Sequence, residues 1–225
     1  MGGLALKQVG ILISGRGSNM VALLDAMDRE EVSARCVLVL SNRADAQGLQ
    51  VAGDRGIPTA VVDHKTSSSR EEHDGKVVEA LRGAGVEIVC LAGYMRLLSP
   101  LFIRAFPNRI LNIHPALLPT FPGLHVQQKA LDAGVRFSGC TVHLVDEEVD
   151  HGAIVLQAVV PVLPDDDEGS LSRRILHYEH RLYPAALALV CDGRVRPEGG
   201  VAHLDLTEGE YRRILEHLIC TGETP

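Results

Sequence analysis

The sequence predicts an α/β fold, a Rossmann-like, doubly wound and mostly parallel sheet with an antiparallel C-terminal portion. In the first half, short runs that are apolar on both sides alternate with segments of helical periodicity. This alternation is typical of parallel strands covered by helices on both faces. In the second half, a short acidic loop joins two apolar runs, a spacing that suits an antiparallel pair.

The first half of the chain is expected to form four strands and three helices. The expected strands are Val9–Ile13, Cys36–Leu40, Thr59–Val62 and Glu87–Leu91, and the helices are Met20–Met27, Asp45–Asp54 and Arg70–Arg82. Ligands on doubly wound sheets bind beyond the carboxyl ends of the strands. That rule directs attention to three loops, Ser14–Asn19, Ala92–Ser99 and His114–Gly123.

The second half is expected to begin with a strand at Arg109–Ile113, which runs into a stiff, proline-rich loop. Two further strands, Phe137–Val145 and Ala153–Val162, flank the acidic loop. Asp165–Asp167 precede a helix and suit the positive end of its dipole. That helix has Leu171, Ile175, Tyr178 and Leu182 on one face. No repeat or linker is evident, so residues 1–225 are interpreted as a single domain.

The composition narrows the class of protein. A net charge of −7 and a pI near 5.8 argue against a duplex-binding protein, which needs a positive surface. No apolar run is long enough to span a bilayer, and the N-terminus does not suit a signal peptide. We therefore expect a soluble, cytoplasmic protein. Disulfides and a metal site are not expected from the histidine pattern or from the five cysteines, Cys36, Cys90, Cys140, Cys191 and Cys220.

A glycine-rich loop, Gly15-Arg-Gly-Ser-Asn19, follows the first strand and opens the first helix. It lacks the Gly-Lys-Ser/Thr of a Walker loop, and Met20 replaces the third glycine of the dinucleotide fingerprint. Backbone N–H groups at a helix start favour an anion such as a phosphate monoester. The alternative is a tight turn capped by Ser18 or Asn19, and the loop alone does not decide between the two.

Asn112 and His114 stand two residues apart at the end of an apolar strand, so they share one face. The alternative to a reacting centre is a hydrogen-bonded polar pair in the core. Asp150 ends the acidic loop between two strands, and a carboxylate beside an imidazole fixes its tautomer and stabilises its charge. Spacing alone leaves open that Asp150 belongs to an ordinary solvated turn.

Taken in order, the motifs resemble those of the folate-dependent phosphoribosylglycinamide formyltransferase family. The resemblance runs from about Val9 to Gly193. It rests on Ile13–Asn19, Ser41–Ala46, Leu91–Pro100, Leu111–Pro119, Phe121–His125, Gly139–His143 and Asp146–Gly152.

The resemblance implies an enzyme of de novo purine biosynthesis. Such an enzyme moves a formyl group from 10-formyltetrahydrofolate, as co-substrate, to the amine of glycinamide ribonucleotide, without a metal. It implies that the catalytic residues are Asn112, His114 and Asp150. The ribonucleotide would bind to Gly17, Ser18, Asn19 and Glu179. The folate would bind to Arg70, Met95, Arg96, Leu97, Leu98, Asn112, Asp146, Glu147, Glu148, Val149 and Asp150.

The single formyltransferase domain would then comprise a nucleotide-binding half at about 9–113, a folate-binding and catalytic half at about 114–193, and a tail at 194–225. The expected partners are small molecules, with no nucleic acid or membrane, and the chain is expected to be a monomer or weak homodimer. His151 departs from the family pattern, because a small or neutral residue is expected at this position in relatives.

Two relatives share the same reacting centre. Methionyl-tRNA formyltransferase carries a further C-terminal domain and formyltetrahydrofolate deformylase an extra N-terminal one, and the chain is expected to have neither. A third alternative is a non-catalytic nucleotide- or folate-binding module, in which Asn112 and His114 are only structural.

Overall fold

The computed structural model describes residues 6–218, which form two compact units. The first unit contains the chain up to Asn112 together with Leu144–Glu147. The second contains Ile113–His143 and the chain from Glu148 onward.

The main sheet has seven strands, hydrogen-bonded in the order β3-β2-β1-β4-β5-β6-β7. They are β1 (Lys7–Ile13), β2 (Ala34–Ser41), β3 (Thr59–Val61), β4 (Ile88–Leu91), β5 (Ile110–His114), β6 (Phe137–Leu144) and β7 (Ile154–Pro161). The pairs among β1 to β5 are parallel, and β6 pairs with β7 in the antiparallel sense. The predicted fold class is therefore confirmed.

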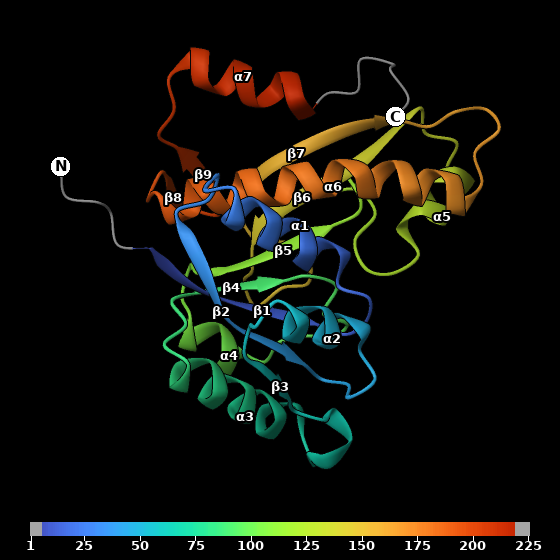
Figure 1. Cartoon of the computed structure of the whole chain (residues 1–225). Helices are drawn as coiled ribbons and strands as arrows, with labels where there is room; N and C mark the ends of the chain where they lie inside the picture. Colours follow the sequence, from blue (N-terminus) through green and yellow to red (C-terminus); the bar gives the residue numbers. More distant parts are fainter. Residues whose placement is uncertain (1–5, 219–225) are drawn as a thin grey trace. The chain divides into compact units, whose positions relative to one another are not determined.

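In the first unit, helices cover both faces of the parallel strands (Figure 1). These helices are α1 (Ser18–Asp28), α2 (Gln47–Asp54), α3 (Arg70–Gly83) and the short α4 (Pro100–Ala105), with a 3-10 turn, η1, at His64–Thr66. Leu12 belongs to a buried cluster with Leu81 of α3 and Phe102 of α4. Side chains alternate along a strand, so Ile13 faces the other way, where it closely approaches Gly48 of α2.

The second unit contains α5 (Val126–Asp132) and the long α6 (Glu168–Cys191) in addition to β6 and β7. Asp167 caps α6: its side chain accepts a hydrogen bond from the Ser170 N–H, and the Ser170 hydroxyl accepts one from the Asp167 N–H. The four apolar residues predicted to share one helix face are all buried. Beyond α6 follow β8 (Val195–Glu198), β9 (Val201–Leu204) and α7 (Glu208–Leu218).

The predicted strands and helices are present, with ends shifted by one or two residues. Five features had no counterpart in the sequence prediction: η1, α4, α5, the β8–β9 hairpin and α7. Helix α4 has six residues, which is too short for a periodic apolar pattern. Within the part of the chain that is described, the expected tail thus carries regular structure.

The cysteines Cys36, Cys90, Cys140 and Cys191 have free thiols, and Cys220 lies outside the described residues. Between residues 6 and 218, no helix combines the length and the apolar content needed to cross a membrane.

Candidate functional site

The glycine loop of the first unit ends in a left-handed residue. Gly17 has φ +75° and is the N-cap of α1, which starts at Ser18. No side chain caps the helix, so the expected cap at Ser18 or Asn19 is wrong, which leaves an anion site and a tight turn without a side-chain cap as the alternatives. The first N–H groups of a helix have no partner within it, and the helix dipole is positive there. Gly17, Ser18 and Asn19 therefore form a helix start suited to an anion.

Close packing against α2 fixes this loop. The Gly48 N–H donates to the Gly15 carbonyl at 3.0 Å. A Cβ atom on Gly48 would lie 2.6 Å from Ile13 Cδ1 and 3.3 Å from the carbonyl oxygens of Gly15 and Arg16. Sequence reasoning missed Gly48, because a need for glycine that arises from a contact over thirty residues away leaves no local signal.

The segment after β4 holds four predicted folate-binding residues. Met95 and Leu97 are 64% and 57% exposed, among the higher values for the large apolar side chains of the described residues. Leu98 packs against the buried cluster of Leu12, and Arg96 is half-buried. The segment thus displays two apolar side chains while its C-terminal part is anchored in the core.

The remaining predicted folate residues of the first unit are more dispersed. Arg70 is exposed at the start of α3, with its Nε atom 3.9 Å from Glu71. Glu147 is exposed and lies 3.6 Å from Arg104, whereas Asp146 and Asn112 are half-buried. Asn112 is the third residue of β5, two before His114, so both side chains leave the same face of that strand.

In the second unit, His114 and Asp150 are in contact. His114 Nδ1 lies 3.4 Å from Asp150 Oδ2, and the two side chains are only 6% and 12% exposed. His114 Nε2 lies 2.9 Å from the Phe121 carbonyl oxygen. A backbone carbonyl only accepts, so Nε2 carries a proton. With a carboxylate facing Nδ1 as well, each ring nitrogen has an oxygen acceptor beside it.

A third titratable group, His143 of β6, completes the surroundings of Asp150. Its Nε2 atom lies 3.9 Å from Asp150 Oδ1, and its side chain is 2% exposed. Asp150 adopts φ +52°, a left-handed conformation that aspartate tolerates better than most residues. Sequence reasoning gave His143 no role beyond its place in the Gly139–His143 motif, since the contact depends on how the loop folds back.

Buried polar side chains hold the proline-rich loop that follows His114. The Thr141 hydroxyl accepts from the Leu118 N–H at 3.0 Å and donates to the Ala116 carbonyl at 2.7 Å. Gln157 donates to the Leu118 carbonyl at 2.9 Å. At its far end, the Gly123 N–H donates to Asp150 Oδ2 at 2.8 Å. The loop that follows the imidazole therefore also hydrogen-bonds its carboxylate partner.

The other predicted residues of the second unit differ in burial. Glu179 of α6 is buried, and its carboxylate adds to burial in raising the pKa of the Cys140 thiol. Glu148 and Val149 are exposed. His151, the residue that departs from the family pattern, is also exposed, and its Nε2 atom lies 3.9 Å from Glu148.

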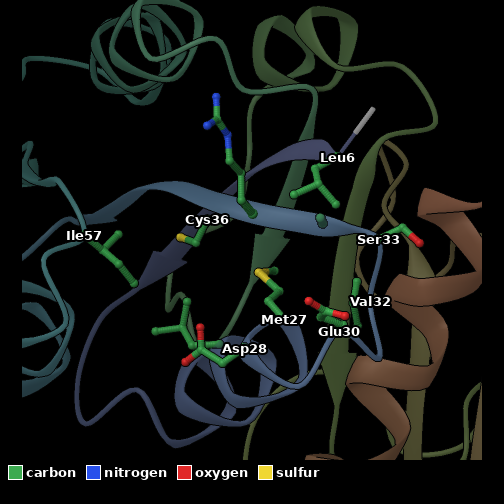
Figure 2. Close-up of a pocket in the computed structure, with 11 residues that line it drawn as sticks. Leu6, Met27, Asp28, Glu30, Val32, Ser33, Cys36 and Ile57 are labelled. Atoms are coloured by element: carbon green, nitrogen blue, oxygen red, sulfur yellow. The ribbon is translucent and has the colours of Figure 1, made fainter. Parts of the chain in front are cut away.

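A separate pocket of about 480 Å³ lies in the first unit, between the end of α1 and the start of β2 (Figure 2). Its lining includes Leu24, Met27 and Cys36, and burial raises the pKa of the Cys36 thiol to about 12. None of the predicted site residues lines it. Across residues 6–218, no group of three or more His, Cys, Asp or Glu side chains is placed to hold a metal ion.

Comparison with known proteins decides the family. The sequence model described as "Formyl transferase" matches residues 7–187, most of the chain. The chain belongs to the formyl transferase family. Within this family, it is 42% identical over 200 residues to the phosphoribosylglycinamide formyltransferase of Haemophilus influenzae, covering 89% of this chain and 94% of that protein. The resemblance seen in the motifs is therefore confirmed.

Two further proteins similar to this chain support its assignment to the formyl transferase family. The crystal structure of glycinamide ribonucleotide transformylase 1 from Symbiobacterium toebii superposes with a TM-score of 0.88 at 48% identity, covering 89% of this chain and 94% of that one. The trifunctional purine biosynthetic protein adenosine-3 of Drosophila pseudoobscura pseudoobscura is 53% identical over 192 residues. That alignment covers 84% of this chain, which spans only 14% of the length of the fly protein.

Proposed function

We propose that the protein transfers the formyl group of 10-formyltetrahydrofolate to the primary amine of glycinamide ribonucleotide, yielding the formylated ribonucleotide of purine biosynthesis. The observation that carries the proposal is the contact between His114 and Asp150, at 3.4 Å, inside the motifs shared with the family. The similarity to the Haemophilus influenzae enzyme, over nearly its whole length, supports the choice of acceptor.

The proposed reaction requires stabilisation of a negative oxygen. The amine nitrogen attacks the formyl carbon, a C–N bond forms, and the carbonyl electron pair moves onto the formyl oxygen. The Asn112 amide N–H and a protonated His114 donate hydrogen bonds to that oxygen. When the carbonyl re-forms, the bond to the folate nitrogen breaks and this nitrogen takes up a proton.

Proton transfer is the proposed role of Asp150. Its carboxylate keeps the facing nitrogen of His114 protonated and accepts, through water, the proton that the attacking amine loses. In the substrate-free protein, His114 Nε2 donates to the Phe121 carbonyl. Donation to the formyl oxygen from this nitrogen therefore requires the substrate to replace that carbonyl as the acceptor.

Substrate binding is assigned to the remaining predicted residues. We place the ribonucleotide phosphate on the N–H groups at Gly17, Ser18 and Asn19, with Glu179 contacting the same substrate. The folate is placed on the exposed Met95–Leu98 segment and the Asp146–Asp150 loop, with Arg70 near its acidic tail. The reaction needs no metal, the partners are small molecules, and the chain acts as one formyltransferase domain in the cytoplasm, as a monomer or weak homodimer.

An assay of formyl transfer with both substrates tests the proposal. We expect turnover by the unmodified protein and a loss of about a hundredfold or more in Asn112→Ala, because removing one oxyanion donor has that effect. The matched control is Asn108→Gly, at an exposed residue with φ +56° where glycine fits. Binding of both substrates without turnover would instead favour the non-catalytic module, and near-normal turnover in Asn112→Ala would refute the mechanism.

A further inference from the structure

We propose that Ser14, His73 and Asp74 are positioning residues that clamp the segment Tyr94–Ser99 in the conformation that binds the folate. All three lie in the first unit, and none of them is among the predicted site residues. The identity of the ligand rests on the proposed function, whereas the clamp itself rests on the hydrogen bonds of this unit.

Ser14 holds the N-terminal part of the segment. It lies at the end of β1, is 7% exposed, and its N–H donates to the Gly93 carbonyl at 3.1 Å. Its Oγ atom accepts from the Met95 N–H at 2.8 Å and donates to Asn42 Oδ1 at 2.6 Å. The one hydroxyl proton is therefore used on Asn42, which leaves the oxygen free to accept from Met95.

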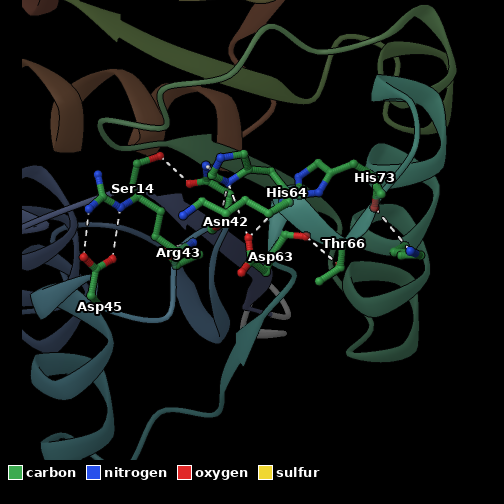
Figure 3. Close-up of polar contacts among 12 residues, drawn as sticks. Ser14, Asn42, Arg43, Asp45, Asp63, His64, Thr66 and His73 are labelled. Atoms are coloured by element: carbon green, nitrogen blue, oxygen red, sulfur yellow. Dashed lines mark hydrogen bonds and ion pairs between the residues drawn. The ribbon is translucent and has the colours of Figure 1, made fainter.

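Asn42 is itself fixed from the opposite side. Figure 3 shows Asn42 between Ser14 and the ring of His64. His64 Nδ1 lies 2.9 Å from the Asn42 backbone oxygen and 3.3 Å from Asn42 Nδ2. The carbonyl only accepts, so the shorter contact assigns a proton to Nδ1, and the longer contact is not a donation to that nitrogen. The backbone of the residue that provides the acceptor for the Ser14 hydroxyl is thus held in place.

Helix α3 holds both ends of the segment. His73 and Asp74 are fully buried on this helix. Asp74 Oδ2 accepts from the Ser99 N–H at 2.6 Å, directly before α4 starts at Pro100. His73 Nε2 lies 2.9 Å from the Tyr94 hydroxyl. Burial, together with the Arg96 guanidinium, lowers the pKa of His73, so the ring is neutral at physiological pH. Its Nε2 atom and the Tyr94 hydroxyl share one hydrogen bond.

The held segment displays its ligand-facing groups outward. Tyr94 and Ser99 are buried, while Met95 and Leu97 between them are mostly exposed. Apolar side chains on a loop bind a ligand more tightly when the loop is ordered beforehand, because the entropy of ordering is not lost on binding. The clamp therefore contributes to folate affinity although it does not touch the folate.

The clamp is separate from the support of the glycine loop. Ser14 directly precedes Gly15, which starts the glycine loop, but its hydroxyl bonds to Met95 and Asn42. The glycine loop is separately held by the backbone of Gly48. Removing the Ser14 hydroxyl should therefore disturb the folate segment more than the phosphate loop.

Amide hydrogen exchange in the ligand-free protein tests the clamp without any substrate. We expect Ser14→Ala to speed exchange at the Met95 amide about tenfold or more, since that N–H loses its acceptor. Ser14→Thr keeps the hydroxyl and should restore slow exchange. The matched control is Ser138→Ala, which removes a buried hydroxyl that has no hydrogen-bond partner. Unchanged exchange at Met95 in Ser14→Ala would overturn the clamp.

Calorimetry with each substrate tests the functional half. Ser14→Ala should weaken binding of 10-formyltetrahydrofolate about tenfold, as expected for one lost hydrogen bond, and that of the ribonucleotide less than twofold. Asp74→Asn, which keeps an acceptor oxygen, provides a milder variant with the same expected preference. Equal losses for both substrates, or none, would contradict the inference. Turnover by the unmodified protein is a separate result, so failure of the proposed function is distinguishable from failure of the clamp.

Discussion

The candidate site residues of the two units differ in the kind of chemistry that surrounds them. In the first unit, the side chains that support the Tyr94–Ser99 segment bond to hydroxyls and backbone N–H groups: Ser14 and Asp74 accept from the N–H groups of Met95 and Ser99, and His73 bonds to the Tyr94 hydroxyl. In the second unit, titratable groups face one another, with Asp150 between His114 and His143. We infer from this difference that the first unit, apart from Asn112, serves mainly to hold substrates, whereas the second contains the titratable groups of the proposed proton chemistry.

The comparison between the units requires that a carboxylate of the second unit away from His114 has a structural role only. Asp166 is such a carboxylate, and its substitution tests this requirement. The Arg174 guanidinium donates two hydrogen bonds to the Asp166 carboxylate, at 2.6 and 2.8 Å. The side chain of Asp166 is 2% exposed and that of Arg174 is 14% exposed. Asp166→Ala removes the carboxylate from this ion pair, so we expect a loss of about 3–5 kcal/mol in the free energy of unfolding at neutral pH. Urea denaturation measures it, and kcat should stay near normal.

The pH dependence of this loss is also fixed. The Arg174 guanidinium holds the pKa of Asp166 well below its usual value of 3.8. The stabilisation is therefore complete above that value and disappears as the pH falls through the lowered pKa. A destabilisation by Asp166→Ala that stayed constant down to strongly acidic pH would contradict the ion-pair account.

The next largest effect concerns Asp150, which differs from Asp166 by facing two imidazoles. Asp150→Asn keeps an oxygen for the Gly123 N–H but removes the charge beside His114. We expect kcat to fall about a hundredfold or more, the usual contribution of a positioned acid or base. Glu198→Gln, at an exposed residue of the second unit outside the proposed site, is the control and should change kcat little.

A smaller effect is expected from a residue of the first unit that we assign to substrate binding. Ser18→Ala removes a hydroxyl at the start of α1, where we place the phosphate. A hydrogen bond to a charged group contributes about 1.5–3 kcal/mol, so ribonucleotide binding should weaken roughly tenfold or more. Calorimetry should show no matching loss of affinity for the folate. Equal losses for both ligands would contradict the placement of the phosphate at this loop.

The smallest expected effect is a change in how steeply the free energy of unfolding depends on pH. Burial lowers the pKa of His73 below its usual 6.5, so the unfolded chain binds a proton that the folded chain does not. The unfolding free energy should therefore rise with pH between the lowered pKa and 6.5 and be level above it. His73→Gln should flatten this slope, leaving the similar contributions of His177 and His180. An unchanged slope would show that His73 is charged in the fold.

The sequence predicted those features that depend on neighbouring residues. Apolar runs located β1 to β7, and the spacing of Leu171, Ile175 and Leu182 identified the buried face of α6. Strand periodicity also placed Asn112 and His114 on one face. Each of these follows from backbone geometry over a few residues.

Features that depend on distant contacts had no such signal. Spacing left Asp150 as one acidic residue among several, and only the family resemblance paired it with His114. Gly48, His143 and Thr141 act through residues that lie far away in the sequence. No periodicity records which loop folds back onto which strand, so these roles required the structure.

The most direct test of the division between holding and reacting is the single-turnover rate of formyl transfer at saturating concentrations of both substrates. The account predicts that His114→Ala remains slower than the unmodified protein by about a hundredfold or more, because saturation cannot replace a transition-state donor. It predicts that Ser18→Ala recovers a near-normal rate once its site is filled. Recovery of His114→Ala at saturation, or a persistent loss in Ser18→Ala, would contradict it.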